Sequence, residues 1–191
     1  RRKVVSSARS MGLSRLDLAV RTQSRFCFAN VLNMRNTHTD ATVEAQLAEL
    51  KNHAAEFPVV KAANYSIGIP TLQLLLQLLA RTLPGEFDAE QVETHHVTKI
   101  DQPSGTAAHL AEVWQQHRGG DTVPTHSQRL GGVIGEHTWT FSDQEETLVV
   151  THRAHSRKAF MRGVLPAVRF SHGRAAGLYS LTDVLQGLAG I

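Results

Sequence analysis

The chain has 191 residues, of which 41% are hydrophobic and 19% charged, and its formal net charge at pH 7 is +3. This composition excludes a disordered chain, and the absence of any run of about 18 apolar residues excludes a membrane-spanning helix. Residues 1–40 hold eight of the twenty basic side chains and only two acidic ones, so the remainder of the chain is mildly acidic. Because the basicity belongs to one short arm, we expect no general nucleic-acid surface.

The number of cysteines bears on the cellular compartment and on the kinds of site that the chain can form. Cys27 is the single cysteine, which excludes an internal disulfide and a zinc site made of several cysteines. No residue near it in the sequence suggests an activated thiol. The sequence shows no signal-peptide pattern, so we expect a reducing, cytoplasmic location.

The order of predicted elements indicates the fold class. Residues 1–40 show no clean hydrophobic period, whereas apolar residues from 43 onward recur at the spacing of an amphipathic helix. In chain order we expect a helix over 43–54, a strand over 59–63, helices over 70–81 and 106–117 separated by a strand over 91–97, a β-hairpin over 131–141 and 147–154, a helix over 159–170 and a short segment over 181–188. This order indicates an α/β or α+β fold with helices packed on one sheet.

The densest polar cluster lies between Glu93 and Thr106, where a strand leads through a loop into a helix. Ser104 is suited to cap that helix, whose first N–H groups favour a carboxylate or a phosphate. His95 and Lys99 would lie about 13 Å apart in an extended strand, too far to serve one small molecule. We therefore expect the strand to end near residue 97 and the chain to turn back.

These residues have two alternative interpretations, a solvated surface and a metal site. Two histidines and a lysine at a strand end are most often solvated surface, and isolated motifs of this kind are weak evidence. A metal site is less favoured, because the adjacent His95 and His96 point to opposite faces of a regular strand. His137 and His152 could add ligands only through a tertiary proximity that the sequence does not show, so we predict no metal site.

Four stretches resemble the dihydrodipicolinate reductase family in their order and spacing. They are K-A-A-N-Y-S-I-G at 61–68, H-H-V-T-K-I-D-Q-P-S-G-T-A at 95–107, R-L-G-G-V-I-G-E-H-T at 129–138, and T-H-R-A-H-S-R at 151–157 followed by Phe160 and Gly163. The resemblance covers residues 44 to about 188, and four motifs in the right order make it specific.

The resemblance implies roles for named residues. His95 matches the catalytic acid/base of the family and Lys99 its proton donor. The substrate-binding positions are matched by His96, Ser104, Gly105 and Thr106. The positions that line the nicotinamide cofactor, NADPH or NADH, are matched by Ala62, Ala63, Asn64, Tyr65, Arg157 and Phe160.

The resemblance also implies an organisation and an activity. It implies an α+β fold, a mixed β-sheet with helices packed on one face, joined to a remnant of a Rossmann-type α/β domain. We expect residues 1–43 to be an unplaced basic arm, 44–63 the remnant of the dinucleotide-binding domain, 64–170 the substrate-binding and oligomerisation domain, and 171–191 a tail returning toward the dinucleotide-binding domain. The implied activity is the reduction of a small dicarboxylate, 4-hydroxy-tetrahydrodipicolinate, in lysine biosynthesis by a homotetramer.

The sequence departs from the family at its beginning. Gly12 is the only glycine before Gly68, so the glycine-rich turn that binds the pyrophosphate of a dinucleotide is missing. The alternative is therefore a non-catalytic fragment that folds and oligomerises but lacks the pyrophosphate site. A third possibility, a nucleic-acid binder acting through the basic arm, is the least favoured.

Overall fold

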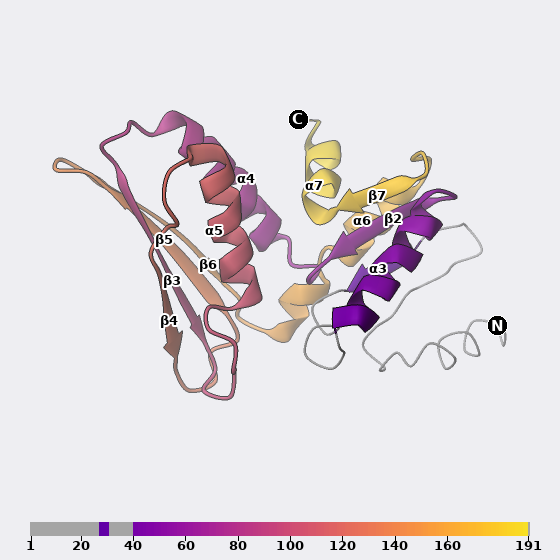
Figure 1. The fold of residues 1–191 in the computed structure, drawn as a ribbon, viewed down its shortest axis with the longest axis horizontal. Helices are drawn as coiled ribbons and strands as arrows, with labels where there is room; N and C mark the ends of the chain where they lie inside the picture. The colour runs from indigo at the N-terminus through magenta and orange to yellow at the C-terminus, as the bar shows by residue number, and fades with distance from the viewer. Residues whose placement is uncertain (1–26, 31–39, 191) are drawn as a thin grey trace. The chain divides into compact units, whose positions relative to one another are not determined.

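The computed structural model describes residues 27–30 and 40–190, which divide into two compact units (Figure 1). The segment Ile67–Ala159 forms one unit, here called the sheet–helix unit. The described residues up to Ser66 and from Phe160 onward form the other, here called the parallel-sheet unit. Most of the expected basic arm, 1–26 and 31–39, lies outside the described residues.

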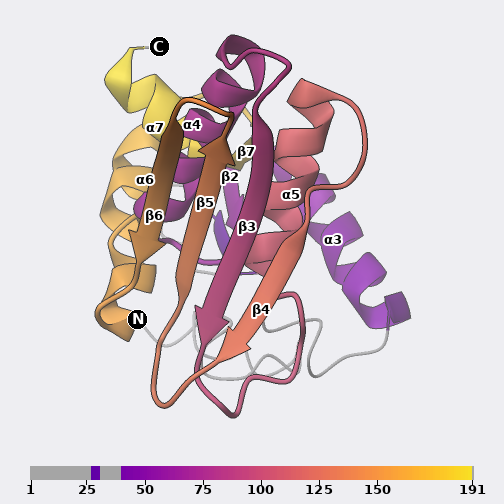
Figure 2. The same cartoon turned by 90° about the vertical axis from the view of Figure 1, so that its left-hand side faces the viewer.

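The sheet–helix unit is a four-stranded mixed sheet with two helices on one face. Its strands lie in the order β4-β3-β5-β6; β3 pairs with β4 in parallel and with β5 antiparallel, and β5 pairs with β6 antiparallel. The elements are α4 (Gly68–Thr82), β3 (Asp88–His95), α5 (Gly105–Arg118), β4 (Thr125–Arg129), β5 (Glu136–Ser142) and β6 (Thr147–Arg153). Figures 1 and 2 show α4 and α5 on the same side of the sheet, and in Figure 2 both lie behind it. The α+β class expected from the sequence is confirmed.

Alternation of side chains along the strands explains why one face is covered. In β5, Trp139 and Phe141 are fully buried against the helices, while Thr138 and Thr140 point to the opposite face. The helices contribute apolar residues to the same core, namely Leu72, Leu76, Ala80, Leu110 and Trp114. Among the described residues of this unit, no helix covers the opposite face of the sheet (Figure 2).

The parallel-sheet unit is built differently. Its three strands, β1 (Cys27–Asn30), β2 (Pro58–Ala62) and β7 (Gly177–Ser180), pair in parallel in the order β1-β2-β7. Its helices are α3 (Asp40–Ala54), α6 (Val164–Ser171) and α7 (Leu181–Ala189). Both valines of the central strand, Val59 and Val60, are fully buried, as expected for a strand covered on both faces.

Several expected elements differ from the structure. The first hairpin strand begins at Glu136 rather than 131, because a turn with Gly131 at φ 44° occupies its expected start. The expected helix 159–170 is a short 3-10 segment, η1 (Arg157–Met161), followed by α6. The segment 181–188 is helical, and strands β1, β4 and β7 were not predicted. Within the described part of the chain, no helix is sufficiently long and apolar to cross a membrane.

Candidate active site

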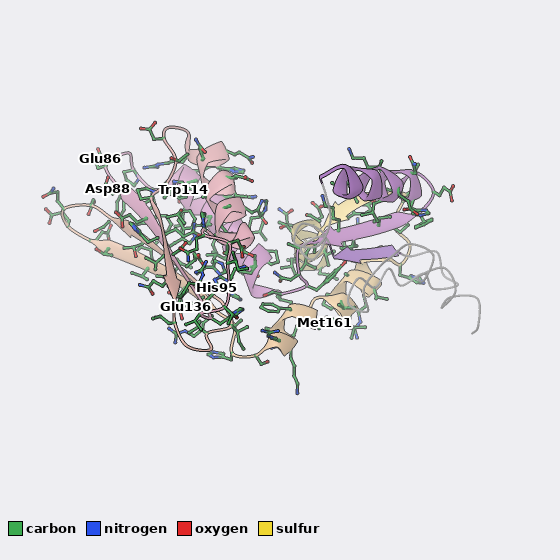
Figure 3. The ribbon with its side chains drawn as sticks, turned by 60° about the horizontal axis from the view of Figure 1, so that its bottom comes forward. Glu86, Asp88, His95, Trp114, Glu136 and Met161 are labelled. Carbon is green, nitrogen blue, oxygen red and sulfur yellow. The ribbon has the colours of Figure 1, made fainter. Side chains whose placement is uncertain are left out.

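The candidate site lies at the end of β3, on the face of the sheet that the helices cover. The side chains of Gln91, Glu93 and His95 alternate onto this face, and all three are buried. Figure 3 shows His95 at the same end of the sheet as Glu136, away from Asp88 at the start of the strand. The core therefore becomes polar at this end.

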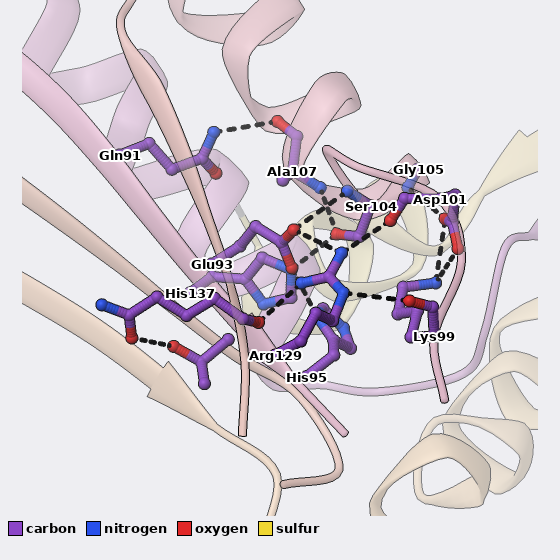
Figure 4. Close-up of polar contacts among 12 residues, drawn as sticks. Gln91, Glu93, His95, Lys99, Asp101, Ser104, Gly105, Ala107, Arg129 and His137 are labelled. Atoms are coloured by element: carbon purple, nitrogen blue, oxygen red, sulfur yellow. Dashed lines mark hydrogen bonds and ion pairs between the residues drawn. The ribbon is translucent and has the colours of Figure 1, made fainter. Parts of the chain in front are cut away.

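Glu93 is the centre of the hydrogen-bond network. Its side chain is fully buried, and its Oε1 accepts hydrogen bonds from Arg129 Nη2 at 2.8 Å and from the Ser104 N–H at 3.3 Å (Figure 4). Its Oε2 faces Nδ1 of His95. Burial alone raises the pKa of Glu93, but hydrogen bonds from Arg129, Ser127 and His95 outweigh burial and lower it. Glu93 is therefore a carboxylate at neutral pH.

His95 keeps one ring nitrogen available for chemistry. Its Nδ1 is engaged by Glu93, while its Nε2 has no hydrogen-bond partner among the described residues. Burial lowers the pKa of His95, Glu93 opposes this effect, and the nearby charges of Lys99 and Arg129 add to it. A Cβ at Gly135 would lie 3.2 Å from Nε2, so a glycine there leaves room beside the ring. A neutral His95 can accept a proton at Nε2, and a protonated one can donate it.

The chain turns back after β3, as expected. The strand ends at His95, and the Lys99 N–H donates to the carbonyl oxygen of His96 at 3.0 Å. Arg129 fixes the turn, because its guanidinium donates to the carbonyl oxygens of Lys99 at 3.2 Å and Asp101 at 2.6 Å. This contact holds the lysine-bearing loop next to the buried Glu93.

The start of α5 completes the site. Ser104 is buried, and its Oγ accepts the Ala107 N–H at 3.2 Å as a helix cap. Lys99 Nζ lies 2.6 Å and 2.8 Å from the two carboxylate oxygens of Asp101, and the Gly105 N–H donates to the same carboxylate at 3.4 Å. Burial raises the pKa of Asp101, but the hydrogen bond and the charge of Lys99, together with backbone hydrogen bonds that include the Gly105 N–H, lower it overall. One carboxylate thus already contacts both the ammonium group and the helix start.

The remaining expected substrate positions are near this loop. His96 is half-buried, and its Nδ1 lies 2.7 Å from Thr98 Oγ1. Thr106 stands in the first turn of α5 and is half-buried. Glu93, Asp101 and Arg129 also belong to the site through their hydrogen bonds, although the family resemblance gives them no role.

A row of histidines extends from the site along the covered face. The ring centroids of His95 and His137 lie 5.4 Å apart, and those of His137 and His152 lie 6.3 Å apart. Burial lowers the pKa of His137 to about 3 and also lowers that of His152. Within the described residues, no group of three or more His, Cys, Asp or Glu side chains could hold a metal ion.

The expected cofactor positions fall in both units. Ala62 ends β2, the central strand of the parallel sheet, and Ala63, Asn64 and Tyr65 follow it. The Tyr65 N–H donates to the Phe160 carbonyl oxygen at 2.9 Å, and the buried Tyr65 hydroxyl donates to Val60 O at 2.9 Å. Arg157 is exposed and belongs to the sheet–helix unit together with His95 and Lys99.

A buried glutamate–histidine pair beside a lysine and a helix start is an arrangement suited to acid–base chemistry on an anionic substrate. The family model described as "Dihydrodipicolinate reductase, C-terminus" matches residues 68–185, which include this whole site. The chain belongs to the dihydrodipicolinate reductase family.

Individual relatives agree with this family. The chain is 39% identical over 166 residues to the 4-hydroxy-tetrahydrodipicolinate reductase of Pseudomonas fluorescens. This match covers 77% of this chain and 62% of that protein. It is 37% identical to the enzyme of the same name from Nitrosomonas europaea, in a match that covers 71% of this chain and 58% of that protein. It is also 37% identical to the enzyme of the same name from Akkermansia muciniphila, where the match covers 77% of this chain and 68% of that protein. The chain thus spans about three fifths of the length of these relatives.

One solved structure supports the fold. The dipicolinate-bound dihydrodipicolinate reductase from Paenisporosarcina sp. TG-14 superposes with a TM-score of 0.59 at 24% sequence identity. The match covers 74% of this chain and 59% of that one. At this identity the similarity concerns the fold alone.

Proposed function

We propose that the chain carries the substrate-binding and proton-transfer part of a 4-hydroxy-tetrahydrodipicolinate reductase of lysine biosynthesis. The observation that carries this proposal is the His95 ring, which is held through Nδ1 by Glu93 and keeps Nε2 available near Lys99. The names of the relatives support the reaction, and the dipicolinate bound to the solved relative supports a pyridine-type dicarboxylate as ligand class.

The substrate is a cyclic dicarboxylate, and the loop after β3 offers matching groups. The Lys99 ammonium and the N–H groups of Gly105 and Thr106 at the start of α5 would bind a carboxylate through charge-assisted hydrogen bonds. His96 and Ser104 lie on the same loop and helix start. A bound substrate carboxylate would replace Asp101 on Lys99 and Gly105.

Reduction of this substrate consumes a hydride and a proton and releases water. His95 and Lys99 are the groups that would move the proton, His95 at Nε2 and Lys99 at Nζ. Because His95 is buried, it would exchange its proton with the substrate rather than with a full solvent shell. A nicotinamide dinucleotide would supply the hydride, since no side chain can do so.

The residues of this chain fit a dinucleotide only in part. The segment Ala62–Tyr65 stands at the carboxyl end of a parallel strand, where α/β sheets bind ligands, and Ala63 is exposed there. However, the sequence contains no glycine-rich strand-to-helix turn that could contact the pyrophosphate. The fit therefore concerns the nicotinamide end alone. The non-catalytic alternative rests on this same observation.

The uncovered face of the sheet supports an assembly of several copies, which we propose to be the homotetramer. Val149 on β6 is 55% exposed there, and it pairs with Thr140 of β5. An apolar and threonine-rich sheet face of this kind is suited to pack against another copy of itself. A cytoplasmic location is proposed together with the biosynthetic role.

Titration calorimetry with pyridine-2,6-dicarboxylate tests the proposed substrate class. We expect the chain to bind this compound and Lys99→Ala to lose most of the affinity. Glu90→Gln is the matched control, because Glu90 lies on β3 but faces away from the site and is exposed. Absence of binding by the unmodified chain, or equal binding by the Lys99 variant, would refute the proposal.

A further inference from the structure

Glu93 has a place in the site that the proposed reaction alone does not explain. It is a fully buried carboxylate in the middle of a sheet, and such a group is costly unless its oxygens are paired. Its two oxygens have different partners. Oε1 accepts from Arg129 and from the Ser104 N–H, whereas Oε2 faces His95 Nδ1.

On the basis of the proposed function, we propose that Glu93 is the positioning residue for His95, holding its ring as the Nδ1–H tautomer so that Nε2 faces the substrate. A carboxylate can only accept hydrogen bonds, so the facing Nδ1 must carry the hydrogen. In the neutral ring, Nε2 then has the lone pair that receives or returns the proton.

Arg129 gives Glu93 a fixed place and a fixed charge. The guanidinium binds Oε1 at 2.8 Å and also donates to the carbonyl oxygens of Lys99 and Asp101. Arg129 therefore connects the orientation of His95 to the position of the loop that carries Lys99. The Ser104 N–H on the same oxygen extends this connection to the start of α5.

A purely structural role for Glu93 predicts something different. If the carboxylate only neutralised Arg129, one of its oxygens would be sufficient for that contact. Nothing would then require the second oxygen to face a histidine two residues along the same strand. The spacing is significant because residues i and i+2 of a strand share one face. The pair Glu93 and His95 is thus built into the regular geometry of β3.

Nuclear magnetic resonance of the ring nitrogens tests this inference without substrate. The full chain is labelled with ¹⁵N-histidine, and the His95 signals are assigned by their loss in His95→Gln. Above its titration midpoint we expect His95 to show a protonated Nδ1 and an unprotonated Nε2, the reverse of the tautomer that predominates for free histidine. This readout needs no variant at Glu93. A signal from Nε2–H in the unmodified chain would overturn the proposal.

Variants at Glu93 extend the test. The charges that face His95 are Glu93 on its own strand, Lys99 on the loop, Arg129 on β4 and, when protonated, His137 on β5. Removal of the single negative one in Glu93→Gln should lower the His95 midpoint by about 1 to 3 pH units and mix the tautomers. The conservative Glu93→Asp should keep the midpoint nearer that of the unmodified chain.

Glu90→Gln is again the control, since Glu90 shares the strand but faces away from the site, and it should leave the His95 signals unchanged. An unchanged tautomer and midpoint in Glu93→Gln would overturn the assignment. Because the spectra contain no substrate, failure of the chain to bind the dicarboxylate would refute the proposed function and leave this readout intact.

Discussion

His137 should make the sheet–helix unit sensitive to acid, through a mechanism that the structure specifies. The ring is buried on the covered face of β5, with Nε2 3.4 Å from Ser104 Oγ and Nδ1 without a partner among the described residues. Ser104 Oγ already accepts the Ala107 N–H, so its own hydrogen can be donated to Nε2. The neutral ring fits this environment, whereas a protonated ring would be a buried charge.

The size of the loss in unfolding free energy follows from the pKa values of His137 in the unfolded and the folded chain. In the folded unit burial lowers the pKa of His137 from 6.5 to about 3. Between these values the unfolded chain binds a proton that the folded chain does not, so the free energy of unfolding falls as the pH falls. From about pH 7 to about pH 5 the loss attributable to this residue is about 2 kcal/mol, at 1.36 kcal/mol per pKa unit. The lowered pKa values of His95 and His152 add losses of the same sign.

Urea unfolding at both pH values, followed by tryptophan fluorescence, measures this effect. Both tryptophans of the chain, Trp114 and Trp139, lie in the core of the sheet–helix unit, so the signal reports that unit alone. We expect His137→Gln to reduce the acid-induced loss by about 2 kcal/mol. His126→Gln on the exposed side of β4 is the control. An equal pH dependence in His137→Gln and the unmodified chain would refute the reasoning.

Four further predictions concern the site and the assembly. His95→Gln and Lys99→Ala should each lower the reduction rate of a complete enzyme by roughly 10²- to 10⁴-fold without unfolding it, as measured by nicotinamide absorbance and circular dichroism; near-normal rates would remove them from the mechanism. Asp101→Asn should tighten pyridine-2,6-dicarboxylate binding by up to about fivefold in calorimetry, since Asp101 competes for Lys99; weaker binding would contradict this. Sedimentation should show an oligomer of the chain, weakened by Val149→Lys but not by Leu78→Lys on α4, and a stable monomer at micromolar concentration would contradict it. Calorimetry should show weak or no NADPH binding by the chain, because the sequence lacks the glycine-rich turn that would bind the pyrophosphate. Each charge-assisted hydrogen bond lost in this way is worth about 1.5–3 kcal/mol, and micromolar affinity would refute the prediction.

Elements with a strong local signal were predictable from the sequence. The helix expected over 106–117 is α5, Gly105–Arg118, since Ser104 caps its start and Gly119 at φ 75° ends it. The hairpin was recognisable because Trp139 and Phe141 alternate with polar residues across β5. A capping box of Ser180 and Asp183 marks the start of α7, and the Ser-x-x-Asp spacing in the sequence is a local signal for this helix.

Other parts had no local signal. Strand β4, T-H-S-Q-R, contains no apolar residue, because it is an edge strand whose one neighbour in the sheet is β3. Its pairing with β3 is parallel and follows a crossover through α5, which periodicity within a short window cannot show. Arg129 ends this strand, so its contact with Glu93, 36 residues earlier, could not be predicted.

Glu93 shows how the position of a charged residue within a strand can indicate a site before any contact is known. The residues of β3 that share the covered face should continue the apolar core, yet Gln91, Glu93 and His95 occupy this face and are buried. A charge is not retained there for stability, since a buried ion pair adds little compared with well-packed apolar side chains. Polar residues on the inward face of a strand, ending at a loop with a lysine and a helix cap, therefore favour a catalytic explanation over a structural one. Arg129 joins the two parts of this pattern, because it donates hydrogen bonds both to the buried Glu93 and to the loop that carries Lys99.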